Sequence, residues 1–205
     1  MSDLAHGLSL LTPKQISKSP TKKTDTASEF RIQGTDGIRC EVKASYSSEV
    51  TGLTPQEAFL KLGFITEEFM ELYAYAHVKR LLHEGKAKAG DDVVVGWDPR
   101  DPRGNFTSAV VSGICKAGAN ALILGVVPTP LVPMYMLYKK AYSGFMVTAS
   151  HNPKDQNGIK IFSSFRGLKL LPENDLTLTC DVLDIDFSTL GKLSIKGKRI
   201  DSRRE

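Results

Sequence analysis

The chain has 205 residues, of which 27 are Lys or Arg, 23 are Asp or Glu, and 41% are apolar. This is the composition of a globular protein, and the length suits one domain with additional segments or two small domains. Three cysteines without paired spacing exclude a disulfide framework and a CxxC metal or redox site, so reduced thiols in the cytoplasm are expected. No apolar stretch approaches the roughly 18 residues of a membrane helix, and neither export nor membrane insertion is expected.

The net charge of +4 is concentrated at the carboxyl end of the chain. Residues 191–205 hold six basic and two acidic side chains, and this surplus of four leaves the rest of the chain neutral. A basic surface that neutralises many phosphates is therefore not expected, and no nucleic-acid partner is predicted.

The amino-terminal third is predicted to hold a leader and a long helix. Residues 1–28 are rich in Ser, Thr and Lys and predict a flexible leader, with ordered structure from about Phe30. Further along, Thr54 followed by Pro55 and Glu57 is a helix-start signature. The 3.6-residue spacing of the apolar positions that follow predicts one amphipathic helix over 53–82, with Gly63 as the point where it would bend or divide.

Apolar runs and helical spacings then alternate along the chain. The sequence predicts strands at 92–97, 121–124 and 144–148, with helices at 105–117 and 130–140 between them. Alternation of this kind predicts an α/β fold, a three-layer α/β/α arrangement with a mixed, mostly parallel sheet.

The last predicted strand, 158–162, follows too soon after the previous one for a helical crossover and is expected to return antiparallel. A closing helix over 172–183, with Pro at its first turn, completes a domain over 29–190. The basic residues 191–205 are interpreted as a linker to a further domain.

Residues 148–160 (TASHNPKDQNGIK) form a polar loop between two predicted strands, where functional groups often collect. Ser150 follows the end of a buried strand, beside free backbone N–H groups that suit a phosphoryl group. His151 supplies a second polar group, and Lys160 faces away from Ile159 and Ile161 and would point back toward Ser150. Composition alone also allows a purely structural turn. A Ser-His-acid hydrolase is disfavoured because the Gly-x-Ser-x-Gly elbow is absent from the loop.

Two further polar clusters precede this loop. In residues 34–39 (GTDGIR), turn-forming glycines stand beside Arg39, which suits a loop that approaches an anion, although G-x-x-G alone is weak. Residues 98–104 (DPRDPRG) place Arg100 near a predicted helix amino terminus, which is itself an anion site. Each cluster also fits a capping turn or a surface ion pair.

The order of these motifs resembles the first domain of the α-D-phosphohexomutases, the phosphoglucomutase and phosphomannomutase family. The resemblance rests on GTDGIR, on Gly96-x-Asp98-x-Arg100 and on TASHNP followed by NGIK, and it runs from about Phe30 to Leu190. It implies interconversion of hexose 1-phosphates and 6-phosphates through a bisphosphorylated intermediate, with hexose 1,6-bisphosphate as the activator. Positioning and charge neutralisation dominate such phosphoryl transfer.

The resemblance also implies roles for individual residues. Ser150 matches the serine that carries the phosphoryl group, one oxygen of which is a ligand of the catalytic Mg²⁺. Arg39 and Lys160 match cations around that serine, Arg100 a phosphate-binding cation, and His151 a group that hydrogen-bonds the substrate. Lys160 is a candidate proton carrier, which requires a pKa lowered by neighbouring cations or by burial.

Departures from the family pattern limit this expectation. The other Mg²⁺ ligands, in an Asp-Gly-Asp-x-Asp-Arg loop, and the sugar and phosphate sites belong to domains II to IV, whose motifs do not occur here. A phosphoserine alone cannot supply the about six oxygen ligands that such a cation takes, so the isolated chain is predicted to be inactive by itself. Val147-Thr-Ala-Ser150 favours the glucose or mannose branch over the glucosamine branch. The alternatives are a phosphoglucosamine mutase domain and a noncatalytic module that binds sugar phosphates or a partner.

Overall fold

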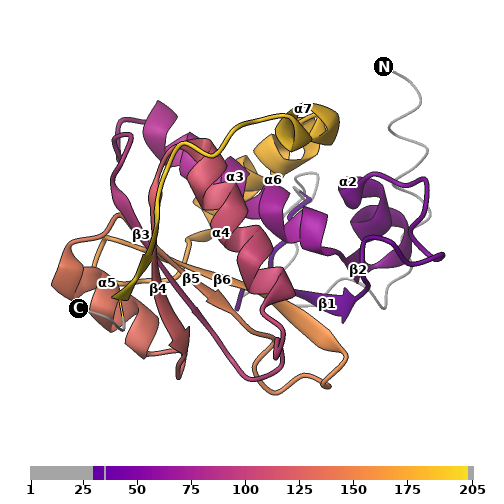
Figure 1. Cartoon of the computed structure of the whole chain (residues 1–205), viewed down its shortest axis with the longest axis horizontal. Helices are drawn as coiled ribbons and strands as arrows, with labels where there is room; N and C mark the ends of the chain where they lie inside the picture. The colour runs from indigo at the N-terminus through magenta and orange to yellow at the C-terminus, as the bar shows by residue number, and fades with distance from the viewer. Residues whose placement is uncertain (1–29, 35, 203–205) are drawn as a thin grey trace, which may run out of the picture.

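The computed structural model of the chain describes residues 30–34 and 36–202 (Figure 1). The predicted leader, 1–28, lies outside the described residues. In chain order the elements are β1 (Ile38–Val42), α2 (Pro55–Glu57), the π-helical turn η2 (Ala58–Leu62), β2 (Phe64–Ile65), α3 (Glu67–His83), β3 (Asp92–Trp97), α4 (Asn105–Ala117), β4 (Asn120–Val126), α5 (Leu131–Lys139), β5 (Ser143–Val147), β6 (Gln156–Ser163), α6 (Pro172–Asp184), α7 (Phe187–Gly191) and β7 (Arg199–Asp201).

The strands of the described residues form one sheet in the order β2-β1-β6-β5-β3-β4-β7. Neighbours are parallel from β5 through β3 and β4 to β7, and β2 is parallel to β1. Strand β6 runs antiparallel to both β5 and β1. The predicted mixed, mostly parallel sheet is confirmed, as is the antiparallel return of its last predicted strand, because the loop between β5 and β6 is too short for a crossover helix.

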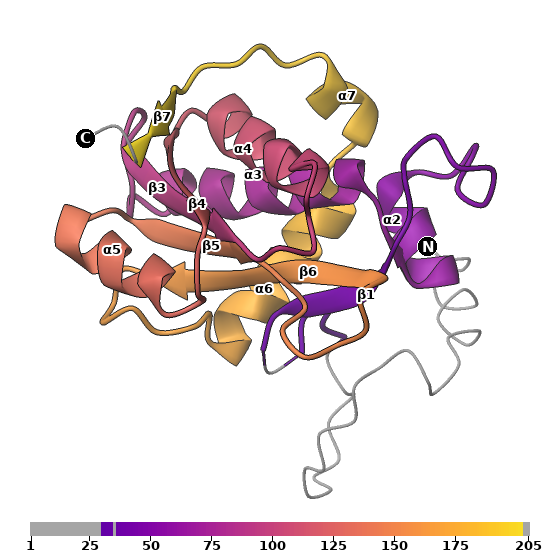
Figure 2. The same cartoon turned by 60° about the horizontal axis from the view of Figure 1, so that its bottom comes forward.

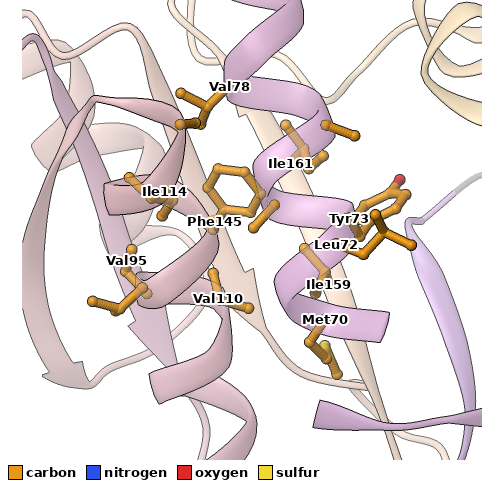
Figure 3. Packing of buried hydrophobic residues seen from close by; sticks show 14 of the residues in the cluster. Met70, Leu72, Tyr73, Val78, Val95, Val110, Ile114, Phe145, Ile159 and Ile161 are labelled. Carbon is orange, nitrogen blue, oxygen red and sulfur yellow. The ribbon is translucent and has the colours of Figure 1, made fainter. Parts of the chain in front are cut away.

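Helices cover both faces of this sheet, which confirms the three-layer arrangement (Figure 2). The larger core joins α3, α4 and α6 to one face, and Figure 3 shows Phe145 of β5 surrounded by side chains of α3, α4 and β6. The smaller core joins α5 to the other face through Val132 and Met136. Because side chains alternate along a strand, Ile159 and Ile161 point into the larger core and Lys160 points to the α5 side.

The predicted helix over 53–82 is divided at Gly63, the position where the sequence allowed a bend or a division. The predicted start is confirmed, since Thr54 and Glu57 form a reciprocal capping box. The first helical segment ends at Gly63, which adopts φ 72°, a left-handed conformation that glycine adopts at low cost. The chain then adds strand β2, and Thr66 caps a new helix, α3, by accepting a hydrogen bond from Phe69 N. Apolar spacing alone did not reveal this interruption.

Part of the carboxyl-terminal segment joins the domain. The predicted linker over 191–205 contains β7, which pairs in parallel with β4. The backbone N–H groups of Lys196 and Gly197 donate to the carbonyl of Cys115 at the end of α4. Residues 196–201 are therefore held to the sheet and to α4 by backbone hydrogen bonds. The boundary at residue 190 and the role of 191–205 as a linker to a further domain stay predictions. No helix among the described residues has both the length and the apolarity to cross a membrane.

Asp175, in the first turn of α6, is a buried acid without a hydrogen-bond partner. The residue is 1% exposed, both carboxylate oxygens are buried, and Arg31 Nε is 4.0 Å from Oδ2. Burial raises the pKa of Asp175 from 3.8 to about 6, and the charge of Arg31 opposes the shift only in part. By contrast, the buried hydroxyl of Tyr73 has a partner, since it donates a 2.9 Å hydrogen bond to Gln33 Oε1.

We expect Asp175→Asn to stabilise the fold at neutral pH. The folded protein holds this proton more tightly than the unfolded chain, so the contribution of Asp175 to stability falls as pH rises from 3.8 to about 6 and stays unfavourable above it. The shift of about two pKa units sets an upper limit of about 3 kcal/mol, and because the buried amide also lacks partners we expect a gain of about 1–2 kcal/mol.

Urea unfolding at several pH values measures this gain. It should disappear in acid, where the Asp175 carboxyl is already neutral. Glu173→Gln, at an exposed position in the same turn, is the matched control and should show no such pH dependence. Equal stability of Asp175→Asn and wild type at neutral pH would contradict the assignment.

Candidate functional site

The predicted functional loop lies between β5 and β6, at the edge of the sheet where the parallel strands β3 and β5 end (Figure 2). Backbone hydrogen bonds hold its base: Asp98 N donates to Val147 O at 3.1 Å, and Thr148 N donates to Gly158 O at 2.9 Å. The carboxyl ends of parallel strands are a common place for ligand sites in α/β proteins.

Ser150 occupies a strained position in this loop. Its φ of 55° is in the left-handed region, which is costly for a residue with a side chain. Ser150 N donates to Thr148 Oγ1 at 2.8 Å, and that hydroxyl donates to Asp98 Oδ2 at 2.5 Å. Ser150 is half-buried and lines an open pocket of about 470 Å³ with Asp98, Met146 and the loop after β4. The serine is thus held in place beside an accessible cavity.

Arg100 lies beneath the same loop. Its Nε donates to Asp98 Oδ2 at 2.9 Å. Its other N–H groups donate to four backbone carbonyls of the loop, those of Ser150, Asn152, Pro153 and Gln156. The sequence predicted that Arg100 binds phosphate; that role stays a prediction, and the structure shows contacts of the guanidinium with the loop itself.

Strands β1 and β6 bring the GTDGIR and NGIK motifs into backbone contact. Arg39 is paired with Gly158 across the two strands. A Cβ atom on Gly158 would lie 1.9 Å from Ile38 O, and one on Gly37, where φ is 98°, would lie 2.2 Å from Ile159 O. Only glycine permits so close an approach at these two positions.

Because of this contact, Arg39 and Lys160 lie on the same face of the sheet. The side chain of Arg39 is 15% exposed, and its Nε is buried without a hydrogen-bond partner. Lys160 is 9% exposed. Burial lowers the pKa of Lys160, and the positive charge of Arg39 lowers it further, while Asp36 and Asp98 oppose the shift.

An ion pair between Asp36 and Lys169 borders the two cations. Lys169 Nζ donates to the Asp36 carboxylate, and this bond lowers the pKa of Asp36. The Asp36 carboxylate also forms an ion pair with Arg39, in which Oδ2 lies 3.3 Å from Nη2. Sequence reasoning missed Lys169, since it follows a turn and reaches the site only because it pairs with Phe162 alongside β6.

The structure brings the remaining predicted residues together less closely. His151 is exposed, and no hydrogen bond of its ring is found among the described residues. Within the same part of the chain, no hydrogen bond joins Lys160 to Ser150, although Lys160 lies within electrostatic range of Asp98, which contacts the serine loop. The predicted roles of both residues stay predictions.

The described residues do not fit a complete Mg²⁺ site. They contain no cluster of three or more His, Cys, Asp or Glu side chains that could hold a metal. Asp98, which lines the same pocket as Ser150, is already bonded to Thr148 and Arg100. Ser150, the predicted metal ligand, would supply one ligand atom where Mg²⁺ takes about six. We therefore derive no step through the metal in this chain.

Comparison with known proteins identifies the family. Residues 31–188 match the family described as phosphoglucomutase/phosphomannomutase, alpha/beta/alpha domain I. The chain belongs to this family. The predicted resemblance to the α-D-phosphohexomutases is thereby confirmed.

Two relatives of this domain I are phosphoglucosamine mutases. That of Pseudomonas putida (strain W619) is 36% identical over 166 residues, 78% of this chain and 32% of the relative. That of Francisella tularensis subsp. novicida (strain U112) is 39% identical over 154 residues, 75% of this chain and 30% of the relative. The chain thus spans about a third of the length of these curated relatives. The preference for the glucose or mannose branch that Val147-Thr-Ala-Ser150 suggested stays a prediction.

A solved structure has the same fold. The crystal structure of a putative phosphomannomutase from Thermus thermophilus superposes with a TM-score of 0.61 at 24% identity, over 87% of this chain and 34% of that one.

We expect Gly158→Ala to destabilise this domain I by about 2–4 kcal/mol, because the added methyl group meets backbone that cannot move without separating β1 from β6. Thermal unfolding measures the effect. The control is Gly191→Ala, where a Cβ atom meets nothing within 4 Å. If both variants unfold at the wild-type temperature, the close contact between the two motifs is not needed.

Proposed function

We propose that this domain I carries the phosphoryl group on Ser150 in a mutase reaction between hexose 1-phosphates and 6-phosphates. The observation that carries the proposal is the pair of largely buried cations, Arg39 and Lys160, on one face of the sheet, where Lys160 is paired with Met146 of the pocket that Ser150 lines. The unpartnered Nε–H of Arg39 supports it, because a buried donor without an acceptor suits a phosphoryl oxygen.

The transfer step needs one proton carrier. In the proposed reaction the bond between phosphorus and Ser150 Oγ breaks as a bond to a sugar hydroxyl oxygen forms. The proton of that hydroxyl passes to a neutral Lys160 amine, and the resulting ammonium returns it to Ser150 Oγ. A pKa lowered by burial and by Arg39 makes the neutral amine accessible. In this proposal the exposed imidazole of His151 hydrogen-bonds the substrate.

The proposed substrates are hexosamine phosphates, with the corresponding 1,6-bisphosphate as activator. The glucosamine phosphates are supported by the names of the relatives from Pseudomonas putida and Francisella tularensis. Glucose and mannose phosphates are the second choice, supported by the description of the matched family. The chain spans about a third of these relatives, which supports the proposal that domains II to IV complete the enzyme and its Mg²⁺ site. We also infer a cytoplasmic location, supported by three free cysteines.

We expect the chain to gain one phosphoryl group on incubation with glucosamine 1,6-bisphosphate or glucose 1,6-bisphosphate and Mg²⁺. Ser150→Ala should abolish the gain, because it removes the acceptor oxygen, and Ser164→Ala, at an exposed serine beyond β6, should leave it unchanged. Intact-mass spectrometry measures the gain, and peptide mapping locates it.

Two outcomes would contradict the proposal. One is a phosphoryl gain that persists in Ser150→Ala. The other is no gain in the wild-type chain even when domains II to IV of the Pseudomonas putida relative are added, which would favour a noncatalytic module.

A further inference from the structure

We propose that Arg100 is a positioning residue for phosphoryl transfer at Ser150. Its guanidinium holds the loop of residues 150–156 so that the backbone carbonyls of the loop point toward Arg100 and away from the Ser150 hydroxyl. The inference rests on the proposed function of Ser150, and it assigns to Arg100 a task other than phosphate binding.

The hydrogen bonds of Arg100 are the first support. Nη1 donates to the carbonyls of Pro153 at 3.1 Å and Gln156 at 2.9 Å, with a longer contact to Asn152, and Nη2 donates to Ser150 O at 2.5 Å. These carbonyls span the whole turn from β5 to β6. A planar guanidinium with donors in fixed directions can hold several acceptors at once, which a lysine ammonium cannot do in the same geometry.

Asp98 completes the arrangement. It accepts from Arg100 Nε at 2.9 Å and from Arg100 N at 3.0 Å, and it also accepts from the hydroxyl of Thr148. The two charged side chains are 14% and 19% exposed, so their charges balance each other in a partly desolvated place. Arg100 therefore has few N–H groups left for a substrate phosphate.

The backbone of Ser150 requires such support. Its left-handed φ of 55° is unfavourable for serine and persists only where surrounding contacts fix it. Two contacts do so from opposite sides of the residue: Thr148 Oγ1 accepts from Ser150 N, and Arg100 Nη2 donates to Ser150 O. Without Arg100, one of the two would be lost.

The orientation of the carbonyls has an electrostatic consequence. Each carbonyl oxygen carries partial negative charge, and four of them near the serine hydroxyl would repel an anionic phosphoryl group. Since they are directed to Arg100, this repulsion is removed before the substrate arrives, which is the preorganisation that phosphoryl transfer depends on.

The test compares Arg100→Gln and Arg100→Ala with Arg103→Gln in the full chain. Arg103 is exposed, and within the described part of the chain it has no hydrogen bond or ion pair, so it controls for the loss of one positive charge. The first readout is the rate of Ser150 phosphorylation by glucosamine 1,6-bisphosphate or glucose 1,6-bisphosphate. We expect a loss of about 10–100-fold in both Arg100 variants, close to wild-type rates in Arg103→Gln, and partial rescue of Arg100→Ala by added guanidinium ion.

The second readout is amide hydrogen exchange, which needs no substrate. Positioning predicts about tenfold faster exchange in Arg100→Gln confined to residues 148–158, with the helices unchanged. Unchanged exchange in that loop, or wild-type phosphorylation rates in Arg100→Gln, would overturn the proposal, and faster exchange throughout the domain would assign Arg100 a general structural role instead. If the wild-type chain accepts no phosphoryl group, the proposed function of Ser150 fails, while the exchange experiment still decides whether Arg100 positions the loop.

Discussion

The site depends on a backbone contact between β1 and β6 that only glycine allows. Gly37 and Gly158 each lie so close to a carbonyl of the opposite strand that a methyl group would overlap it. This contact pairs Arg39 with Gly158 and places the GTDG turn beside Lys160. Two motifs that are more than a hundred residues apart in the chain thereby form one surface.

The contact has an electrostatic cost. It holds Arg39 and Lys160 on one face of the sheet, largely out of water, where burial and the charge of Arg39 disfavour the charged form of Lys160. Asp36 offsets part of this repulsion, and its ion pair with Lys169 keeps its own pKa low. A loss of stability from like charges held close together is common in active sites. We infer that the cations are kept buried for the proposed phosphoryl transfer.

The sequence predicted the layered fold and the loop, because apolar runs, turn residues and strand alternation are local signals. The alternation of side chains along a strand is enough to predict that Lys160 lies on the opposite face of the sheet from Ile159. The break at Gly63 was only partly foreseen, since apolar spacing continues across it while the backbone does not. The contacts of Arg100 and the position of Lys169 beside Asp36 could not be predicted from the sequence, because both depend on how other segments fold against β6.

The pKa of Lys160 tests the account most directly, and it can be measured by following the ε-carbon signal of that lysine by NMR as pH is raised. We predict a pKa below the ordinary 10.5. Arg39→Gln should raise this pKa, because it removes a neighbouring positive charge, and Asp36→Asn should lower it, because it removes a negative one. An ordinary pKa that neither substitution changes would contradict the claim that the contact between β1 and β6 prepares Lys160 to carry a proton.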